Sequence, residues 1–467
     1  MKAKTCIRVL AALVLSALVM GIISCDSTPE PVKPKEEPAN TAALLRQISE
    51  LLGKGDYDRA LALFDKIDPR DAEKAEIRLL KASALLSAGK GAAARSIVDE
   101  ILRIDTNHVP ALLVLAAIEE AQGKTKEERA VLERILKIDA ANVPALVSLG
   151  NLLVRTNSPR AAGSCFDQAL AVEPDNGDAL LGRAWVYRVS REPKNAAVLL
   201  NKAVELYPNW ARALQERGRL LKAMGNPHQA LADLDKAKAL DLNNYYIACD
   251  RGAALNELRR KKEALEEYER AVKINPNYFY AYVYTAGIKD ELNDYDGAAR
   301  DYEILARLNP DYYFAFEGLG MHLMRRGEWL AARDAFMEVY KRAQTDECSY
   351  GLLAAMNWMR GGKLQDPRIF LEDVLKKAQR DSVEYWMIRL YHDLTGETDV
   401  ASRIDREKNP TVKAKMLYYM GCYYDIRGIK SLADKCFLQM RDLDVKNIPE
   451  WRLNEWALEA RGLALNK

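Results

Sequence analysis

Small apolar residues recur at fixed positions along this chain with a period of 34 residues. Units counted from residues 41, 75, 109, 143, 177, 211, 245, 279, 313 and 347 carry Gly or Ala at their eighth position in nine of ten cases. The twentieth position is Ala in eight of the first nine units, and Glu128 is the exception. A repeat of this kind predicts a stack of similar structural units in place of several globular domains.

Larger apolar side chains occupy the positions around the small ones at helical spacing. Small residues at positions 8 and 20 allow two helices to approach, and larger residues fill the space beside them. Glycine at position 15 in five units predicts the end of a first helix, and proline at position 32 in four units predicts the end of a second. Position 24 holds Phe64, Val98, Leu132, Phe166, Leu200, Leu234, Tyr268, Tyr302 and Phe336.

This pattern resembles the tetratricopeptide repeat (TPR) family over residues 41 to about 445. The resemblance implies an all-α fold: a right-handed α-solenoid superhelix of about twelve antiparallel helix pairs with a concave groove. We expect a regular array over residues 41–345 and degenerate units over residues 346–467, where Asp366-Pro367 and Thr395-Gly396 depart from the pattern. Another unit is expected from Ala414, and residues 448–463 are expected to form a capping helix over the last apolar face.

The first forty residues are typical of a secretory leader and a tether. Basic residues precede an apolar stretch at residues 9–23, which as a helix would be about 22 Å long, too short to span a membrane. Residues 1–24 are therefore expected to be a signal peptide. The sequence Ile22-Ile23-Ser24-Cys25 resembles a bacterial lipobox, which implies that Cys25 is acylated, for example with palmitate. Ordinary cleavage near Ser24 is the alternative.

Residues 25–40 hold four prolines among charged residues, which predicts an extended tether between the acylated cysteine and the folded part. With the lipobox, this predicts a protein anchored by lipid to a membrane of the cell envelope, on its periplasmic or outer face.

Charge and cysteine content exclude several classes. Lys and Arg total 69 and Asp and Glu total 67, so no bulk positive field favours nucleic acid. Five cysteines outside the leader are scattered and never at C-x-x-C spacing, which argues against a disulfide framework and a zinc site. We expect them to be buried, although Cys422 and Cys436 share one helix pair and could approach each other. No metal or cofactor is expected.

No catalytic constellation is recognisable in the sequence, and an enzyme is not expected. The four histidines are at least 70 residues apart; His108 and His228 are expected in turns, and His322 and His392 on first helices. One arrangement would point to an enzyme: a convergence of His392, Asp393 and Arg389 with a further acidic residue.

The TPR resemblance implies that positions 2, 5, 9 and 12 of the first helices line the groove. Transferred to this chain, these positions give two candidate binding features. One is a basic band next to Trp185, and the other, which we call the aromatic ladder, repeats at position 2 of three consecutive units. The alternative for the ladder is packing against the second helix of the preceding unit. The basic band comprises Arg188, Arg212, Arg219 and Lys222, and the aromatic ladder comprises Tyr246, Tyr280 and Phe314.

Three functions are compatible with these features. The leading hypothesis is a membrane-anchored scaffold of the bacterial cell envelope that binds partner peptides or proteins in the concave groove. The alternative is a ligand-binding or transporter-associated lipoprotein that holds a small hydrophobic molecule or a solute-binding partner. An open, charged groove would favour the first, and a closed apolar pore lined by the aromatic ladder would favour the second. The third, an enzyme, has no support in the sequence.

Overall fold

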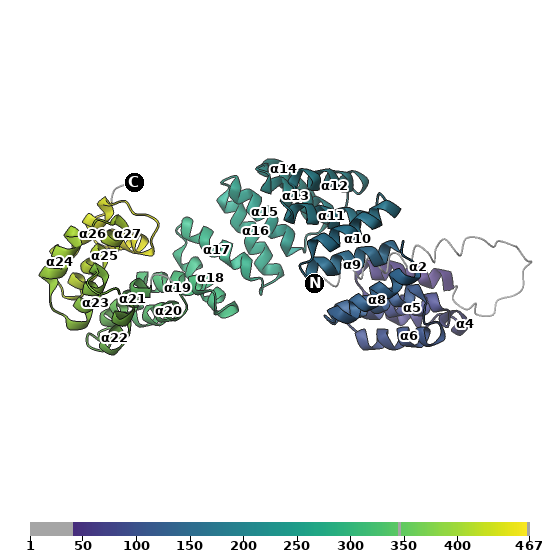
Figure 1. Ribbon diagram of the computed structural model, residues 1–467, viewed down its shortest axis with the longest axis horizontal. Helices are drawn as coiled ribbons and strands as arrows, with labels where there is room; N and C mark the ends of the chain where they lie inside the picture. Colours follow the sequence, from purple (N-terminus) through teal and green to yellow (C-terminus); the bar gives the residue numbers. More distant parts are fainter. Residues whose placement is uncertain (1–40, 344–346, 465–467) are drawn as a thin grey trace, which may run out of the picture. The chain divides into compact units, whose positions relative to one another are not determined.

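The computed structural model describes residues 41–343 and 347–464, and within these ranges it contains helices and no strands (Figure 1). Twelve pairs of consecutive, packed helices are followed by a single helix, and one short extra helix lies between the first two pairs. The expected all-α fold of about twelve helix pairs is therefore confirmed. The expected signal peptide, Cys25 and the tether lie outside the described residues.

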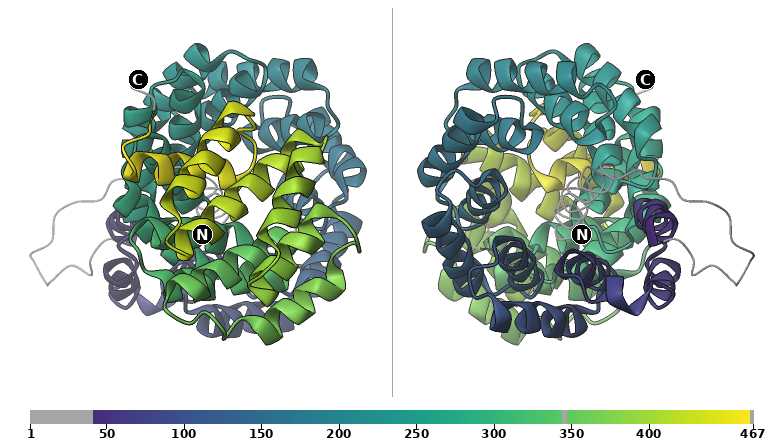
Figure 2. Two further views of the ribbon diagram at one scale, coloured as in Figure 1. Left: turned by 90° about the vertical axis from the view of Figure 1, so that its left-hand side faces the viewer. Right: turned by 90° about the vertical axis from the view of Figure 1, so that its right-hand side faces the viewer.

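The chain divides into two compact units, which span residues 41–240 and 241–464 of the described part. We call them the N-terminal and the C-terminal unit. In each of them, successive helices lie side by side (Figure 2). The N-terminal unit comprises α2 (Thr41–Lys54), α3 (Tyr57–Phe64), α4 (Pro69–Ala72), α5 (Ala75–Ser87), α6 (Gly91–Ile104), α7 (Val109–Ala121), α8 (Thr125–Ile138), α9 (Val143–Arg155), α10 (Pro159–Val172), α11 (Gly177–Val189), α12 (Pro193–Leu206), α13 (Ala211–Ala223) and α14 (Pro227–Leu240).

The C-terminal unit carries the repeat onward and then departs from it. Helices α15 to α20 keep the regular lengths, whereas α22 to α24 are shorter and α25 is longer. Its helices are α15 (Tyr245–Glu257), α16 (Lys261–Ile274), α17 (Phe279–Glu291), α18 (Tyr295–Leu308), α19 (Tyr313–Arg325), α20 (Trp329–Arg342), α21 (Glu347–Arg360), α22 (Arg368–Lys377), α23 (Val383–Asp393), α24 (Glu397–Arg406), α25 (Pro410–Ile426), α26 (Lys430–Asp442) and α27 (Pro449–Ala460).

The 34-residue period fixes where the helices begin. Nine first helices, from α2 at Thr41 to α19 at Tyr313, start at the residue that opens their unit in the sequence pattern. The eight alanines at position 20 have no exposed surface. At position 8, a β-carbon added to Gly252 would stand 3.0 Å from the Tyr268 ring, so a larger residue would separate the two helices of that pair. Gly421 lies in the same way against Phe437, which places the unit expected from Ala414 in register.

The turn between the two helices of a pair has one conformation throughout the regular array. Position 15 has a positive φ whether it holds glycine, as Gly225 does at 79°, or a residue with a side chain, as Arg191 does at 62° and Arg259 at 61°. Glycine adopts this left-handed conformation at little cost, and other residues are strained in it. The tertiary stacking of the pairs therefore imposes the turn even where the sequence lacks glycine.

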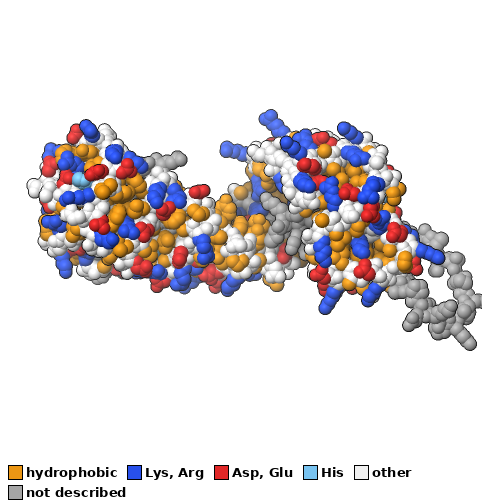
Figure 3. Space-filling view, turned by 90° about the horizontal axis from the view of Figure 1, so that it is seen from below, with side chains coloured by type: hydrophobic (Ala, Val, Ile, Leu, Met, Phe, Trp, Pro, Cys, Tyr) orange, Lys and Arg blue, Asp and Glu red, His pale blue; other side chains and the backbone are white. Residues whose placement is uncertain are grey.

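Helix α27 follows the last pair and packs on α26 and α25, where it buries Leu453 and Leu458. Asn454 donates a hydrogen bond to the carbonyl oxygen of Phe437 at 3.1 Å. The same helix also contacts α19, far back in the sequence of this unit. None of the helices in the described residues is both long and apolar enough to cross a membrane. Charged side chains of both signs are interspersed with apolar ones on the face shown in Figure 3.

Candidate binding site

The basic band lies on α11 and α13 of the N-terminal unit and contains acidic partners of its own. Arg188 and Arg219 both approach Glu216, with nitrogen–oxygen distances of 3.7 and 3.0 Å. Arg212 pairs with Asp178 at 3.0 Å. Lys222 is half-buried on α13, and Trp185 packs against the core of this unit. The surface predicted to be basic is therefore of mixed charge: Asp178 occupies groove position 2 of its own unit, and Glu216 lies outside the groove positions.

The aromatic ladder lies on α15, α17 and α19 of the C-terminal unit. Tyr280 is 62% exposed and Phe314 is 48% exposed, whereas Tyr246 is half-buried. Two tyrosines that immediately precede first helices contact the ladder rings, and Phe279 lies between Tyr280 and Tyr312. The ring centroid of Tyr278 lies 5.6 Å from that of Tyr246 and 5.9 Å from that of Tyr280, and Tyr312 lies 5.5 Å from Phe314.

Tyr278 and Tyr312 were missed in the sequence, although they recur at the same place in two consecutive units. They belong to the turn, which the groove positions of the first helices leave out. In the ladder, Tyr246 packs against Tyr245 of its own helix and Tyr278 of the following turn, and the rings of Tyr280 and Phe314 are exposed to solvent.

A first pocket of the C-terminal unit, of about 500 Å³, lies beside the ladder. Tyr312 and Phe314 line one part of it, and Glu317, Lys446 and Arg452 add charged groups. This lining differs from the closed apolar pore that would favour the ligand-binding alternative for the ladder. Aromatic residues and arginine are enriched at protein–protein interfaces.

A buried polar cluster attaches α27 to α17, α18 and α19. Nε2 of His322 lies 2.8 Å from Oδ1 of Asp290, and the hydroxyl of Tyr302 donates to Oδ2 of Asp290 at 2.9 Å. Arg452 of α27 donates to the carbonyl oxygen of Asp290 at 3.2 Å, at the end of α17, where free carbonyl groups favour a cation. His322 is only 3% exposed, so it is a packed residue of this cluster.

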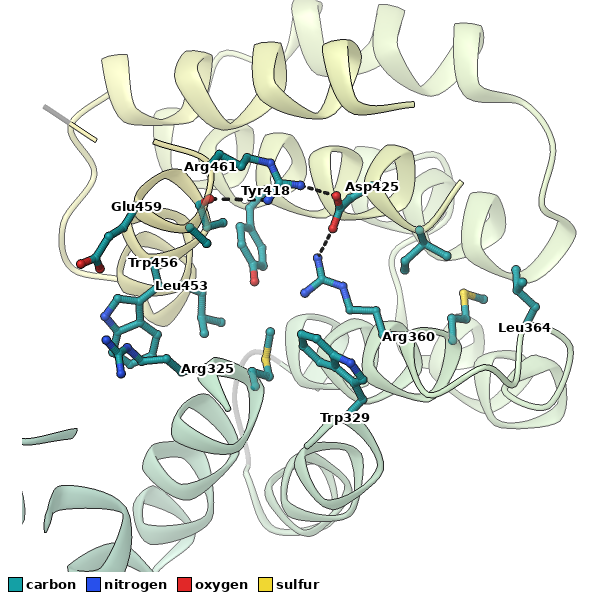
Figure 4. A pocket seen from close by; sticks show the side chains of 15 residues that line it. Arg325, Trp329, Arg360, Leu364, Tyr418, Asp425, Leu453, Trp456, Glu459 and Arg461 are labelled. Atoms are coloured by element: carbon teal, nitrogen blue, oxygen red, sulfur yellow. Dashed lines mark hydrogen bonds and ion pairs between the residues drawn. The ribbon is translucent and has the colours of Figure 1, made fainter. Parts of the chain in front are cut away.

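A second, larger pocket of about 790 Å³ lies within the C-terminal unit among α19, α20, α21, α25 and α27 (Figure 4). Apolar and aromatic side chains form part of its walls, among them Met324, Trp329, Met359, Leu453 and Trp456. Three arginines also line it, on α19, on α21 and just beyond α27: Arg325, Arg360 and Arg461.

Asp425 holds two of these arginines. Its Oδ2 lies 3.0 Å from Nη2 of Arg360, and its Oδ1 pairs with Arg461, which also contacts Asp434 at 2.9 Å. The guanidinium of Arg360 stacks over Trp329, 5.0 Å from the ring centroid. The sequence did not reveal this pocket, because its wall depends on the return of α27 and on residues where the repeat pattern is weak.

Two family profiles described as tetratricopeptide repeat match the chain, one at residues 51–118 and the other at residues 147–209, 216–279 and 289–347. Together they cover more than half of its length. The chain belongs to the tetratricopeptide repeat family. Proteins of this family mediate protein–protein interactions.

Solved TPR structures resemble parts of this chain. pilF of Pseudomonas aeruginosa is 22% identical, with a TM-score of 0.39, over 43% of this chain and 92% of pilF. A TPR protein of Parabacteroides merdae is 17% identical, with a TM-score of 0.38, over 53% of this chain and 98% of that protein. YrrB, a TPR protein with an unusual peptide-binding site, is 22% identical, with a TM-score of 0.31, over 39% of this chain and 95% of YrrB. These similarities concern the fold alone. A comparison with curated proteins finds no match.

The histidines of this TPR chain do not form a buried catalytic group in the described residues. His392 does converge with acidic residues: its Nδ1 lies 2.6 Å from Asp393, and its Nε2 lies 3.8 Å from Glu372. Arg389 pairs with Asp393 at 2.6 Å, and the bonds from His392 and Arg389 outweigh burial and hold the pKa of Asp393 below its usual value. Glu372 is largely exposed, and none of these side chains lines either pocket described above, so the group is a surface ion-pair network.

The other two histidines lie at helix starts. His108 accepts a hydrogen bond from the Ala111 amide at 3.2 Å and so caps α7. The prediction that His228 lies in a turn is wrong: it is in the first turn of α14, because Pro227 is well suited to open a helix and extends α14 to that point. Cys422 and Cys436 are both buried and form no disulfide.

Proposed function

We propose that this protein is a membrane-anchored scaffold of the bacterial cell envelope, and that the aromatic ladder of its C-terminal unit binds a partner protein through an exposed peptide segment. The observation that carries the proposal is the exposure of Tyr280 and Phe314 at equivalent places on two consecutive first helices, connected through the rings of Phe279 and Tyr312. Large aromatic rings with exposed area are frequent energetic anchors of interfaces.

The surroundings of the ladder favour a peptide over a small apolar molecule. Glu317, Lys446 and Arg452 lie in the adjacent pocket and offer both signs of charge. Backbone groups and polar side chains of a peptide can pair with such residues, while its apolar side chains contact the rings. The repeat of the ladder every 34 residues suits a partner segment that extends across several units.

The leader supports the membrane anchor. The basic start, the short apolar stretch and Cys25 form the pattern of a lipoprotein signal, and the proline-rich residues 25–40 would hold the repeats away from the membrane. Several acyl chains on one cysteine give stable anchoring, which a single chain does not.

The partner site is tested by capture from gently solubilised native membranes. The protein and a Tyr246→Ala, Tyr280→Ala, Phe314→Ala variant would be compared, with Ile104→Ala, Val198→Ala, Leu240→Ala as a matched control that removes exposed apolar residues from second helices. We expect one protein to be retained by the wild type and the control and lost from the ladder variant. Retention of the same proteins by all three would contradict the site.

The anchor is tested separately with two cysteine variants. Cys25→Ser should abolish labelling by a palmitate analogue and move the protein out of the membrane fraction. Cys6→Ser, in the same leader, should leave both unchanged. Membrane association of the Cys25→Ser variant at the wild-type level would contradict the lipid anchor.

A further inference from the structure

The aromatic ladder contains two equivalent corners, each formed by one tyrosine of a turn and one ladder ring. Tyr278 and Tyr280 have ring centroids 5.9 Å apart and planes inclined by 58°. Tyr312 and Phe314, which follow 34 residues later, are 5.5 Å apart and inclined by 54°. In each corner the turn residue is half-buried and the ladder ring is exposed. Two consecutive units therefore present the same pair of adjoining aromatic faces to a small apolar group.

Phe279 joins the two corners and limits the distance between them. Its ring centroid lies 5.6 Å from that of Tyr280 and 5.1 Å from that of Tyr312. Tyr280 and Tyr312 are therefore separated by no more than these two distances together. One turn of a polyproline II helix holds three residues and is about 9 Å long, which fits within that span. The two corners thus suit two side chains that are three residues apart on such a helix.

Hydrogen-bond donors accompany the corners. Burial raises the pKa of the Tyr278 and Tyr312 hydroxyls, so both remain protonated at neutral pH and able to donate. Within the described residues neither hydroxyl makes a hydrogen bond to the protein. Proline has no backbone N–H, and the carbonyl groups of a polyproline II helix make no internal hydrogen bonds, so such a segment offers acceptors. A proline-rich segment therefore complements both the rings and the hydroxyls, as in other aromatic-lined grooves.

This protein itself holds a segment of that kind in its tether, residues 25–40, which lie outside the described residues. The tether contains four prolines, and Pro31 and Pro34 are three positions apart, the spacing that puts two prolines on one face of a polyproline II helix. Charges of both signs flank Pro34, and the pocket lined by Tyr312 and Phe314 also holds both signs. They include Lys33, Lys35, Glu36 and Glu37 in the tether, and Glu317, Lys446 and Arg452 in the pocket.

We propose that the aromatic ladder binds the proline-rich tether of a second copy of this protein, with Pro31 and Pro34 in the two corners. The proposal rests on the proposed function, in which the ladder is a peptide site, and it names the segment that this site receives. The proposed lipid anchor places copies on one face of a membrane, which raises the effective concentration of tethers around each ladder. Each contact leaves one ladder and one tether free, so the interface links copies into chains.

Peptide binding tests the two prolines. A fluorescent peptide of residues 26–40 is titrated with the purified full-length Pro31→Ala, Pro34→Ala variant, whose own tether does not compete. We expect the peptide to bind at least tenfold more tightly than a peptide that carries Pro31→Ala and Pro34→Ala. A peptide with Pro29→Ala and Pro38→Ala keeps the proline pair and should bind within threefold of the unaltered one. Absence of binding, or equal binding of all three peptides, would overturn the proposal.

The receiving site is tested with two exposed tyrosines of α17, both placed in the same full-length variant. Tyr280→Ala removes one wall of the first corner and should weaken binding of the unaltered peptide at least tenfold. Tyr284→Ala removes a ring that is 45% exposed and stacks on Tyr268, outside the ladder, and should leave binding within twofold. Phe314→Ala, in the second corner, should cost as much as Tyr280→Ala. Equal effects of the two tyrosine changes would contradict the site.

A mixture of two full-length variants tests the second copy as the source of the segment. One variant, Tyr280→Ala, Phe314→Ala, keeps the tether and lacks the ladder. The other, Pro31→Ala, Pro34→Ala, keeps the ladder and lacks the proline pair. Both also carry Cys25→Ser, so that acyl chains do not cause association. We expect each to be monomeric alone and the mixture to form a one-to-one complex in sedimentation velocity. A mixture that stays monomeric would overturn the proposal, even if the peptide binds.

These outcomes are distinguishable from those that test the scaffold function. Capture of a different protein through the ladder, together with a tether peptide that does not bind, would leave the scaffold function in place and overturn the second copy as partner. Co-purification of untagged with tagged copies, lost when either copy lacks what it contributes, the ladder or the proline pair, supports the proposal.

Discussion

Gly150 of α9 lies directly against the ring of Phe166 of α10: a β-carbon built on Gly150 would stand 2.6 Å from Cε1 of Phe166. The ring is fully buried, and Gly182 of the next unit lies against the same ring. One phenylalanine thus occupies the space left by two glycines, one in its own unit and one in the next. This contact shows how the repeat controls both the packing within a pair and the stacking between pairs.

Gly150→Ala should therefore destabilise the protein, although alanine favours helices. The added methyl group has to displace a buried ring, and overpacking of this kind costs about 1–3 kcal/mol. Gly287→Ala is the matched control, because Gly287 also lies within a helix but has open space around it. That change should stabilise by up to about 1 kcal/mol. Urea unfolding followed by circular dichroism measures both, and a Gly150→Ala variant as stable as wild type would contradict the packing.

The sequence predicted this part of the fold well because its contacts are local. Positions 8 and 24 are sixteen residues apart, and each contact repeats in the next unit, so residue size at a fixed spacing reports on helix packing. Glu128 is the exception at position 20, and it is buried where other units have alanine. Its carboxylate is paired with the next unit, because Arg155 contacts both of its oxygens at 2.6 Å.

Glu128→Ala should remove a pH-dependent destabilisation. Burial raises the pKa of Glu128 above 4.5 despite Arg155, so its ionised form is disfavoured in the fold. The contribution of this group to stability is present below pH 4.5 and is lost as the pH rises through the folded-state pKa. Arg155 keeps Glu120 as a partner at 2.7 Å in the variant.

We therefore expect Glu128→Ala to be as stable as wild type or about 1 kcal/mol more stable at pH 7, with a smaller gain at pH 4. Urea unfolding at the two pH values measures the difference. Glu133→Ala, which removes an exposed partner of Arg129, should change stability by less than about 0.5 kcal/mol at either pH. A loss of stability in Glu128→Ala that is larger at pH 7 than at pH 4 would contradict the expectation.

Arg259→Gly should stabilise the turn between α15 and α16. Arg259 has a φ of 61°, its side chain is exposed, and the same position holds glycine in five other units. Relief of left-handed strain is worth about 1–2 kcal/mol, and the greater freedom of glycine in the unfolded chain removes part of it. We expect a net gain of about 0.5–1 kcal/mol in thermal or urea unfolding. Gly225→Ala, at a turn with open space around it, should lose a similar amount of stability. A loss of stability in Arg259→Gly together with a gain in Gly225→Ala would refute this account.

The candidate sites were predicted less completely than the fold, for a physical reason. The ladder residues Tyr280 and Phe314 follow the repeat and could be named from the sequence. Asp178, the partner of Arg212, occupies groove position 2 but was left out of the predicted band, and Glu216, the partner of Arg188, lies outside the groove positions, so the band was predicted to be more basic than it is. The pocket beside Arg360 is lined by α27, which returns to earlier helices of its unit. One contact of this return joins residues 162 positions apart, Asp290 and Arg452, and no periodic signal encodes it.

That long-range contact leads to a prediction about α27. Asp290→Ala removes the acceptor of both His322 and Tyr302, and leaving buried polar groups without a partner costs about 1–3 kcal/mol each. The effect should be local: amide hydrogen exchange should become faster in α27 (Pro449–Ala460) and at the facing ends of α17 and α19, and remain unchanged in α5 to α12.

Two further variants separate the contribution of the Arg452 hydrogen bond to the protection of α27 from that of the Asp290 side chain. Arg452→Met keeps an apolar side chain against Tyr295 and Trp456 but removes the hydrogen bond to the carbonyl of Asp290, so it should speed exchange in α27 and leave α18 and α19 protected. Asp296→Ala removes an exposed carboxylate that pairs with Arg326 and should leave exchange in α27 as in wild type. If α27 keeps its protection in both Asp290→Ala and Arg452→Met, packing on α25 and α26 alone holds this helix, and the wall of the 790 Å³ pocket does not depend on the Asp290 cluster.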